Sequence, residues 1–172
     1  MKLSVGHKVV YPCQGPCRIG SVISKVVAGR PTSFYRLIVL DEKGGELFVP
    51  LDRANSLGIR QLLDKSEIAA VFRQLKTRTT ADENWKQRTA YNAKLLASGS
   101  AFDLVKVIQS LSSLNTARAL SPRDRQMLDC ARRILIAEIS EVTGVSKQAT
   151  EEQVDNALGV ASHEREAVNR SV

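Results

Sequence analysis

The chain has 172 residues, of which 43% are hydrophobic, and its formal net charge is +7 at pH 7. Its mean hydropathy is -0.16, and its longest apolar runs are far shorter than the roughly 20 residues that a membrane-spanning helix needs. These properties exclude a membrane protein and predict a soluble chain with one core or two small ones. Because the first residues lack the pattern of a secretory signal, we expect a cytoplasmic protein.

The positive charge is unevenly distributed along the chain. Residues 1–64 carry a net charge of +4, residues 65–147 carry +6, and residues 148–172 carry -3. A basic middle segment favours binding to a polyanion such as nucleic acid, although such an imbalance can also reflect an ordinary solvated surface.

The first 50 residues have the pattern of a small β domain. Runs rich in β-branched and aromatic residues predict strands at 8–11, 17–23, 34–40 and 46–50. Glycine and proline between these runs supply the backbone angles that hairpin turns need. We therefore expect a strongly bent antiparallel sheet or barrel that ends at Pro50, because proline cannot donate a hydrogen bond to a β ladder.

From residue 54 the hydrophobic period changes from two to about three and a half, which predicts helices. We expect Ser66, Asp82 and Ser121 to be N-caps, and Pro122 strengthens the last of these. The expected helices run from Ser66 to Lys76, Asp82 to Gly99, 102 to 115, Ser121 to Gly144, and 150 to 158.

The fold class expected from these patterns is α+β. A small antiparallel β domain should occupy residues 1–62, and an all-helical domain of about five helices should occupy residues 63–160. Residues 161–172 are expected to form a flexible tail.

The sequence offers little for catalysis or metal binding. His7 and His163 are the only histidines, and no nucleophile, phosphate loop or dinucleotide motif accompanies them. Cys13 and Cys17 lie close to His7, but structural zinc usually requires four ligands in paired spacings. We therefore expect no enzyme activity, metal, cofactor or small-molecule substrate, and we leave open whether the two cysteines have a redox or metal role.

The single tryptophan, Trp85, is surrounded in the sequence by cations. An exposed indole can insert at a base step while basic side chains hold phosphates, so Trp85 is a candidate DNA wedge. The alternative is that Trp85 belongs to the core, where large aromatic side chains usually lie. The cations expected to contact DNA are Lys86, Arg88, Lys94, Arg125 and Arg132. Because no base-reading helix is evident, we expect recognition of a distorted duplex rather than of a strict sequence.

Several motifs, in order and with compatible spacing, resemble the CarD/CdnL bacterial transcription regulators. They are Val5-Gly6-His7-Lys8-Val9-Val10-Tyr11-Pro12 with Gly15, Val49-Pro50, Asn84-Trp85 followed by Lys94-Leu95-Leu96-Ala97-Ser98-Gly99, and Leu120-Ser121 leading into Met127-Leu128-Asp129-Cys130-Ala131-Arg132-Arg133-Ile134-Leu135. The resemblance covers about residues 3–142.

This resemblance implies a Tudor-like N-terminal domain that binds the β subunit of RNA polymerase. It also implies a helical domain that contacts promoter DNA at the upstream edge of the transcription bubble and stabilises the open complex. Trp85 matches the wedge position of the family, and Arg88 and Arg125 match its basic DNA-contacting positions. Lys25 and Phe48 fall where polymerase contacts are made, and the adjoining Val49 and Pro50 complete the expected polymerase-binding set.

The chain also departs from the family pattern. Gln87 and Ala90 stand where basic residues are frequent, which thins the DNA-contacting surface or shifts it to Lys86 and Lys94. Lys25 replaces a frequent arginine, and Phe48 stands where some relatives have arginine, so the polymerase contact should be more apolar.

These observations together predict a bacterial, nucleoid-associated transcription regulator that is not an enzyme. The alternative that the residues leave open is an adaptor whose basic helical domain binds an acidic protein, with Trp85 buried in its core.

Overall fold

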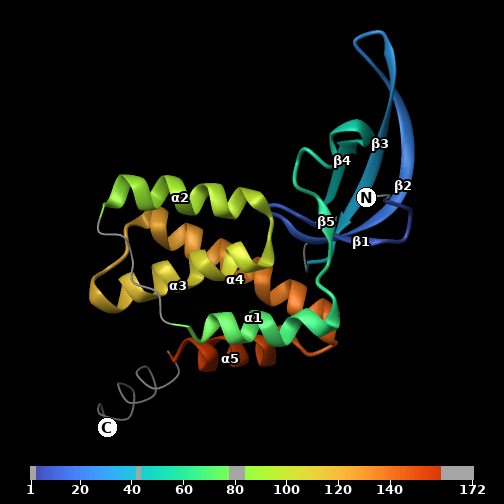
Figure 1. The fold of residues 1–172 in the computed structure, drawn as a ribbon. Coiled ribbons are helices and arrows are strands. Elements are labelled where there is room, and N and C mark those ends of the chain that lie inside the picture. Colours follow the sequence, from blue (N-terminus) through green and yellow to red (C-terminus); the bar gives the residue numbers. More distant parts are fainter. Residues whose placement is uncertain (1–2, 42–43, 78–83, 160–172) are drawn as a thin grey trace.

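The computed structural model describes residues 3–41, 44–77 and 84–159. An antiparallel sheet is followed in sequence by a bundle of helices, so the expected α+β order is confirmed (Figure 1). The sheet has five strands in the order β4-β3-β2-β1-β5. The strands are β1 (Lys8–Tyr11), β2 (Gly15–Val27), β3 (Arg30–Val39), β4 (Glu46–Pro50) and β5 (Arg60–Gln61).

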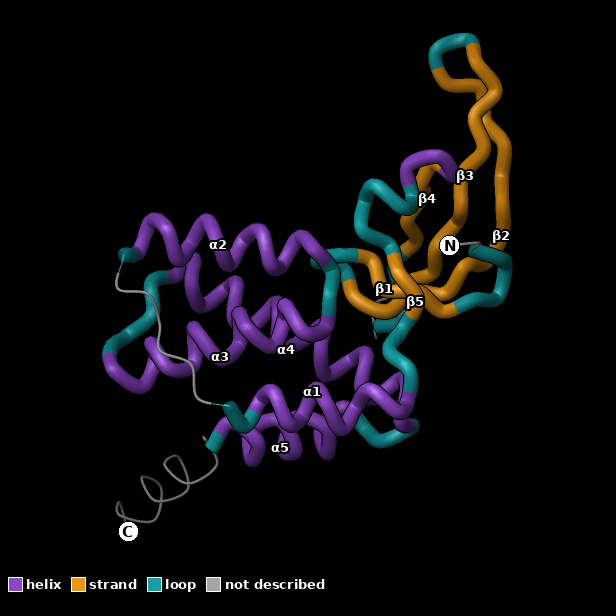
Figure 2. Tube along the Cα trace, viewed as in Figure 1, coloured by secondary structure: helices purple, strands orange, loops and turns teal. Residues whose placement is uncertain are grey.

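The β2–β3 hairpin is longer than the sequence pattern predicted. Its strands stay paired as far as Val27 and Arg30, and the turn consists of Ala28 and Gly29, with φ angles of 51° and 77°. Two positive φ angles in succession are typical of the two-residue turns whose twist matches that of a hairpin. The arm therefore projects beyond the remaining strands, as Figure 2 shows.

Five α-helices follow, as expected, although several bounds differ. They are α1 (Ile68–Leu75), α2 (Trp85–Ser98), α3 (Ala101–Ala117), α4 (Pro122–Thr143) and α5 (Lys147–Leu158). Single-turn 3-10 helices lie at Leu51–Arg53, between β4 and β5, and at Lys65–Glu67, directly before α1.

Two of the three expected N-caps are wrong. The 3-10 turn Lys65–Glu67 leads into α1, and the backbone N–H of Asp64 donates to the Glu67 carboxylate at 2.8 Å, so Ser66 does not cap the helix. Asn84 caps α2, because its side chain accepts hydrogen bonds from the N–H groups of Lys86 and Gln87. Asp82 lies outside the described residues, as does the expected tail at 161–172.

The start and end of α4 agree with the sequence signals. The Ser121 hydroxyl accepts a hydrogen bond from the N–H of Asp124 at 3.1 Å, and Pro122 occupies the first turn, where its missing N–H is harmless. Gly144, with φ 75°, ends the helix in the left-handed conformation that glycine adopts without strain.

Two hydrophobic clusters form the interior of the molecule. One lies against the sheet and includes Ile19, Leu37 and Val49. The other fills the helical bundle and includes Val10 of β1 together with Leu104, Ile134 and other helix residues. Because Val10 belongs to the cluster of the bundle, the sheet and the helices share part of their buried surface.

Candidate nucleic-acid interface

Trp85 is exposed at the first residue of α2, with 60% of its surface accessible. The Lys86 ammonium lies 5.6 Å from the centroid of its ring, within cation–π range. Figure 1 shows that α2 begins at the end of the bundle farthest from the sheet and runs back toward it. The structure therefore places Trp85 at an outer tip of the molecule, and the alternative of a buried core tryptophan is wrong.

Lys94 extends the exposed side of α2. The spacing of Lys86, Ala90 and Lys94 is i, i+4, i+8, and all three are exposed, so they lie along one side of the helix. Tyr91 was missed by the sequence reasoning, although 56% of its surface is accessible. Its signal was its helical position, because Tyr91 falls with the exposed Ala90 and Lys94 outside the face that α2 buries in the bundle.

Arg88 does not contribute an exposed cation, contrary to expectation. Only 3% of its surface is accessible, and its guanidinium lies 3.6 Å from the carboxylate of Asp124 on α4. Asp124 in turn accepts a hydrogen bond from the Ser121 hydroxyl at 2.9 Å. Because Arg88 faces the bundle in this way, we leave it out of the proposed set of direct DNA contacts.

The Arg88–Asp124 pair nevertheless determines which cations lie near Trp85. Arg88 is one turn beyond Trp85, and Asp124 is in the first turn of α4. The contact therefore brings the start of α2 close to the start of α4. Arg123 and Arg125 flank Asp124 in the sequence, and both are exposed, as is Arg118 before the helix. We name this set, with Trp85 and Lys86, the distal tip.

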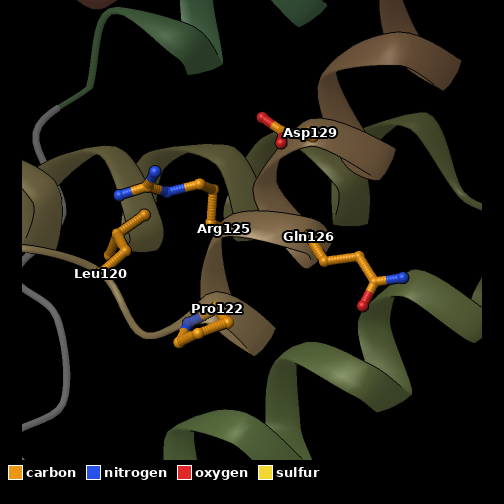
Figure 3. Close-up of a pocket in the computed structure, with 5 residues that line it drawn as sticks. All are labelled: Leu120, Pro122, Arg125, Gln126 and Asp129. Carbon is orange, nitrogen blue, oxygen red and sulfur yellow. The ribbon is translucent and has the colours of Figure 1, made fainter.

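A surface depression of about 420 Å³ lies on the first two turns of α4. It is lined by Leu120, Pro122, Arg125, Gln126 and Asp129. Figure 3 shows the Arg125 guanidinium extending on the side of Leu120, whereas the Gln126 amide points the opposite way. The depression is mainly apolar and carries one cation, Arg125, and one carboxylate, Asp129, so only its Arg125 side can meet a phosphate.

Arg132 also differs from expectation. Its guanidinium lies 2.7 Å from Asp155 and 3.4 Å from Glu151, both on α5. These carboxylates compensate its charge and hold it between two helices, so we leave Arg132 out of the distal tip as well.

The expected polymerase-binding residues divide between the two faces of the sheet. Lys25 on β2 and Phe48 on β4 meet on the outer face, where the Lys25 ammonium lies 4.7 Å from the centroid of the Phe48 ring. Pro50 is half-buried opposite Phe34 of β3. Val49 alternates to the inner face and is 2% exposed, so its side chain belongs to the core and only its backbone remains for a partner.

A salt bridge joins the strands beside Phe48. Arg36 pairs with Glu46 across β3 and β4 and lies on the same outer face as Phe48. The hydrogen bond from Arg36 lowers the pKa of Glu46, and the same bond raises the pKa of Arg36. Because β4 is the first strand in the sheet order, no strand among the described residues pairs with its outer edge, which can accept a strand of another protein. We name Lys25, Arg36, Phe48, Pro50 and this edge the outer sheet face.

The cysteines form no metal site among the residues that the structure describes, where no three His, Cys, Asp or Glu side chains gather. Cys17 is buried in the sheet, and its burial raises the pKa of its thiol to about 11. Cys13 is exposed in the turn after β1, with φ 63°, and its carbonyl lies 3.9 Å from the Cys130 thiol of α4.

None of the helices in the described part of the chain is long and apolar enough to cross a membrane.

Comparisons with known proteins match the two parts of the chain separately. The family described as "CarD-like/TRCF RID domain" matches residues 3–63, and the family described as "CarD, C-terminal domain" matches residues 67–155. Together with the small antiparallel sheet and the five helices, these matches define a two-domain transcription regulator that interacts with RNA polymerase. The chain belongs to the CarD/CdnL family, whose members are transcription factors rather than enzymes.

Two relatives illustrate this similarity. The Bacillus subtilis (strain 168) protein with the name "Putative transcription factor YdeB" is 24% identical over 147 residues, which span 84% of this chain and 94% of that protein. The solution NMR structure of the 72-residue N-terminal domain of Myxococcus xanthus CarD is 37% identical, with a TM-score of 0.30. That match covers 35% of this chain and 79% of the solved domain.

Proposed function

We propose that this protein binds the β subunit of RNA polymerase through the outer sheet face and stabilises the promoter open complex through the distal tip. In this proposal residues 1–62 dock on polymerase and residues 63–160 carry Trp85 to the upstream edge of the bubble. The protein would then act in the cytoplasm, where the nucleoid lies.

The observation that carries the proposal is the exposure of Trp85 among cations at the outermost turn of α2. An apolar side chain of this size costs free energy when it is left in water, so its exposure in a charged setting is typical of an interaction site. Lys86, Arg123 and Arg125 supply positive charge near the indole for phosphates on either side of a base step.

The free-energy cost of inserting the indole between bases also favours an opening duplex over a closed one. Inserting an indole between paired bases requires unstacking, which costs a few kcal/mol per step in an intact helix. At the edge of a bubble the bases are already partly unstacked, so the insertion costs less. A gain of about 1.4 kcal/mol in the open state would raise its equilibrium ratio tenfold, and one wedge can supply this.

The polymerase contact is supported by the pairing of Lys25 with Phe48. A cation held over an aromatic ring presents an apolar patch with one positive charge, beside the outer edge of β4. Such a surface fits strand addition, in which backbone hydrogen bonds give affinity and neighbouring side chains give specificity.

Two single substitutions test the proposal through different steps. Trp85→Ala should leave the affinity for polymerase unchanged but shorten the open-complex lifetime about tenfold, as measured by decay after addition of a competitor. Phe48→Ala should weaken polymerase binding itself by about 5-fold or more, because truncation of an aromatic anchor at an interface costs more than about 1 kcal/mol. An unchanged lifetime with a folded, polymerase-bound Trp85→Ala protein would refute the role of the wedge.

A further inference from the structure

A partly buried ion pair joins the sheet to the bundle at a point remote from both proposed surfaces. Glu138 of α4 is 0% exposed, and its two carboxylate oxygens accept hydrogen bonds from Arg60 of β5 at 2.6 and 2.8 Å. The N–H of Leu63 donates to the same carboxylate at 2.8 Å. Two parallel bonds to a planar guanidinium fix direction as well as distance, so this contact restricts how β5 is oriented on α4.

The same arginine also reaches the end of α2. The Nε–H of Arg60 donates to the carbonyl oxygen of Gly99 at 2.7 Å, and Gly99 ends α2 with φ 73°. One side chain thus connects β5, the middle of α4 and the C-terminal end of the helix whose first residue is Trp85.

The backbone around Gly99 is packed so closely that a side chain there would require its neighbours to shift. A Cβ atom at Gly99 would lie 3.0 Å from the Pro12 ring and 3.1 Å from the carbonyl oxygen of Gly58. A Cβ atom at Gly58, which has φ 75°, would lie 3.1 Å from the same Pro12 ring. The turn after β1, the segment before β5 and the end of α2 therefore meet in close contact.

A second group of contacts lies along the same boundary. Arg133 of α4 donates to the carbonyl oxygens of Cys13 and Gln14 at 2.9 and 3.0 Å, and Lys8 of β1 pairs with Glu141. Contacts at several separated points oppose both tilting and twisting of the bundle on the sheet. We name the set of Pro12, Gly58, Arg60, Gly99 and Glu138 the joint.

The position of the joint relative to Trp85 makes its geometry important. Helix α2 has 14 residues, so at 1.5 Å per residue Trp85 lies about 20 Å from the end that is anchored at Gly99. A tilt of about 10° at the joint would displace the indole by roughly 3.5 Å over this length. That displacement matches the spacing of one base pair in a stack, about 3.4 Å.

We propose that the joint fixes the direction of Trp85 relative to the outer sheet face, and that Arg60, Glu138 and Gly99 are positioning residues for the open complex. This inference rests on the proposed function. When polymerase holds the sheet, the joint determines where the indole meets the DNA, although no joint residue belongs to the outer sheet face or the distal tip.

Gly99→Ala, with Gly144→Ala as a matched control, tests the inference in the full chain. Both glycines end a helix with φ near 75°, so both substitutions introduce the same backbone strain. A Cβ atom at Gly144 meets nothing within 4 Å, whereas one at Gly99 would press on the Pro12 ring and on the carbonyl oxygen of Gly58, so that the joint must shift to accept it. Arg60→Lys is a milder second variant, because lysine retains the charge but loses the planar fork that pairs with Glu138 and reaches Gly99 at the same time.

Three quantities are measured for each folded variant: affinity for polymerase, open-complex lifetime, and energy transfer in the free protein. The natural donor is Trp85, the sole tryptophan. The acceptor is a thiol-reactive dye on Val26→Cys, an exposed position on the β2–β3 arm. Cys13 and Cys130 are replaced by serine so that they do not react with the dye, and Cys17 is kept because it is buried. Trp85→Ala is included in the lifetime measurement as a reference.

We expect Gly99→Ala and Arg60→Lys to bind polymerase within about twofold of the wild type, shorten the lifetime about fivefold and change the energy transfer. Gly144→Ala should change neither the lifetime nor the transfer. If Trp85→Ala shortens the lifetime but Gly99→Ala and Arg60→Lys behave like Gly144→Ala, the role of the joint is refuted and the proposed function stands. If Trp85→Ala has no effect on the lifetime, the proposed function fails, and the joint has no part in open-complex stability.

Discussion

Trp85 and Arg88 lie within one turn of α2 but face different surroundings. The indole is exposed at the tip, whereas the guanidinium is enclosed between α2 and the first turn of α4. Their roles are therefore complementary in the proposed function: Trp85 contacts DNA, and Arg88 holds the turn that presents it. The burial of Arg88 could not be predicted from its helical spacing, because its partner Asp124 is distant in the sequence and is located only by the packing of α2 on α4.

Arg88→Ala should therefore lower the free energy of unfolding. The DNA affinity of the molecules that remain folded should change less. Removing one member of a buried ion pair leaves the other without compensation, and this costs about 3 kcal/mol of unfolding free energy. Urea unfolding measures the loss. Lys86→Ala is the control, since its side chain is exposed and its removal should change stability by less than about 0.5 kcal/mol. Equal stabilities of the two variants would contradict the structural role of Arg88.

At the scale of the elements, local signals predicted the helices well. Ser121, Pro122 and Gly144 act on the neighbouring backbone, so they predict the start and the end of α4 without knowledge of the tertiary structure. Strand β5 was missed because its two residues are a strand only through pairing with β1. The outer half of the β2–β3 hairpin was missed because it projects beyond the core, so no alternation of buried and exposed residues marks it.

The N-cap of α4 offers a prediction with a matched control. Ser121→Ala should destabilise the protein by about 1 kcal/mol, because the hydroxyl caps the helix and also bonds to Asp124. Ser100→Ala, at the corresponding position of α3, removes a hydroxyl that makes no cap hydrogen bond and should cost only a few tenths of a kcal/mol. Thermal or urea unfolding of the two variants compares them directly, and a larger loss for Ser100→Ala would contradict the assignment.

At the scale of the whole molecule, the sequence predicted two domains but not how they are connected. The resemblance placed Lys25 and Phe48 in one surface and Trp85 in another, and the structure separates these surfaces by the length of the bundle. The joint brings together Pro12, Gly58 and Gly99, which are far apart in the chain and which each look like ordinary turn residues in isolation. Only the tertiary structure shows that a Cβ atom at Gly58 or Gly99 would press on the same Pro12 ring.

The distribution of charge over the molecule predicts which arginines affect the salt dependence of DNA binding. Arg123→Ala with Arg125→Ala should reduce the slope of log affinity against log salt by about 2 on a duplex with an unpaired bubble, because each lost phosphate contact removes about 0.9. Arg132→Gln should leave the slope unchanged, since Arg132 is occupied by Asp155 and Glu151. The reverse result would place the DNA-contacting surface on the α4–α5 side instead of at the distal tip.

The most direct test of the central claim is a site-specific crosslink from position 85 in the assembled complex of this protein, polymerase and promoter DNA. A photoreactive benzoylphenylalanine that replaces Trp85 should crosslink to DNA at the upstream edge of the bubble, and the same group at Ala97 near the joint end of α2 should not. Crosslinks from position 85 to polymerase alone, or none to DNA from an open complex that contains the protein, would contradict the account.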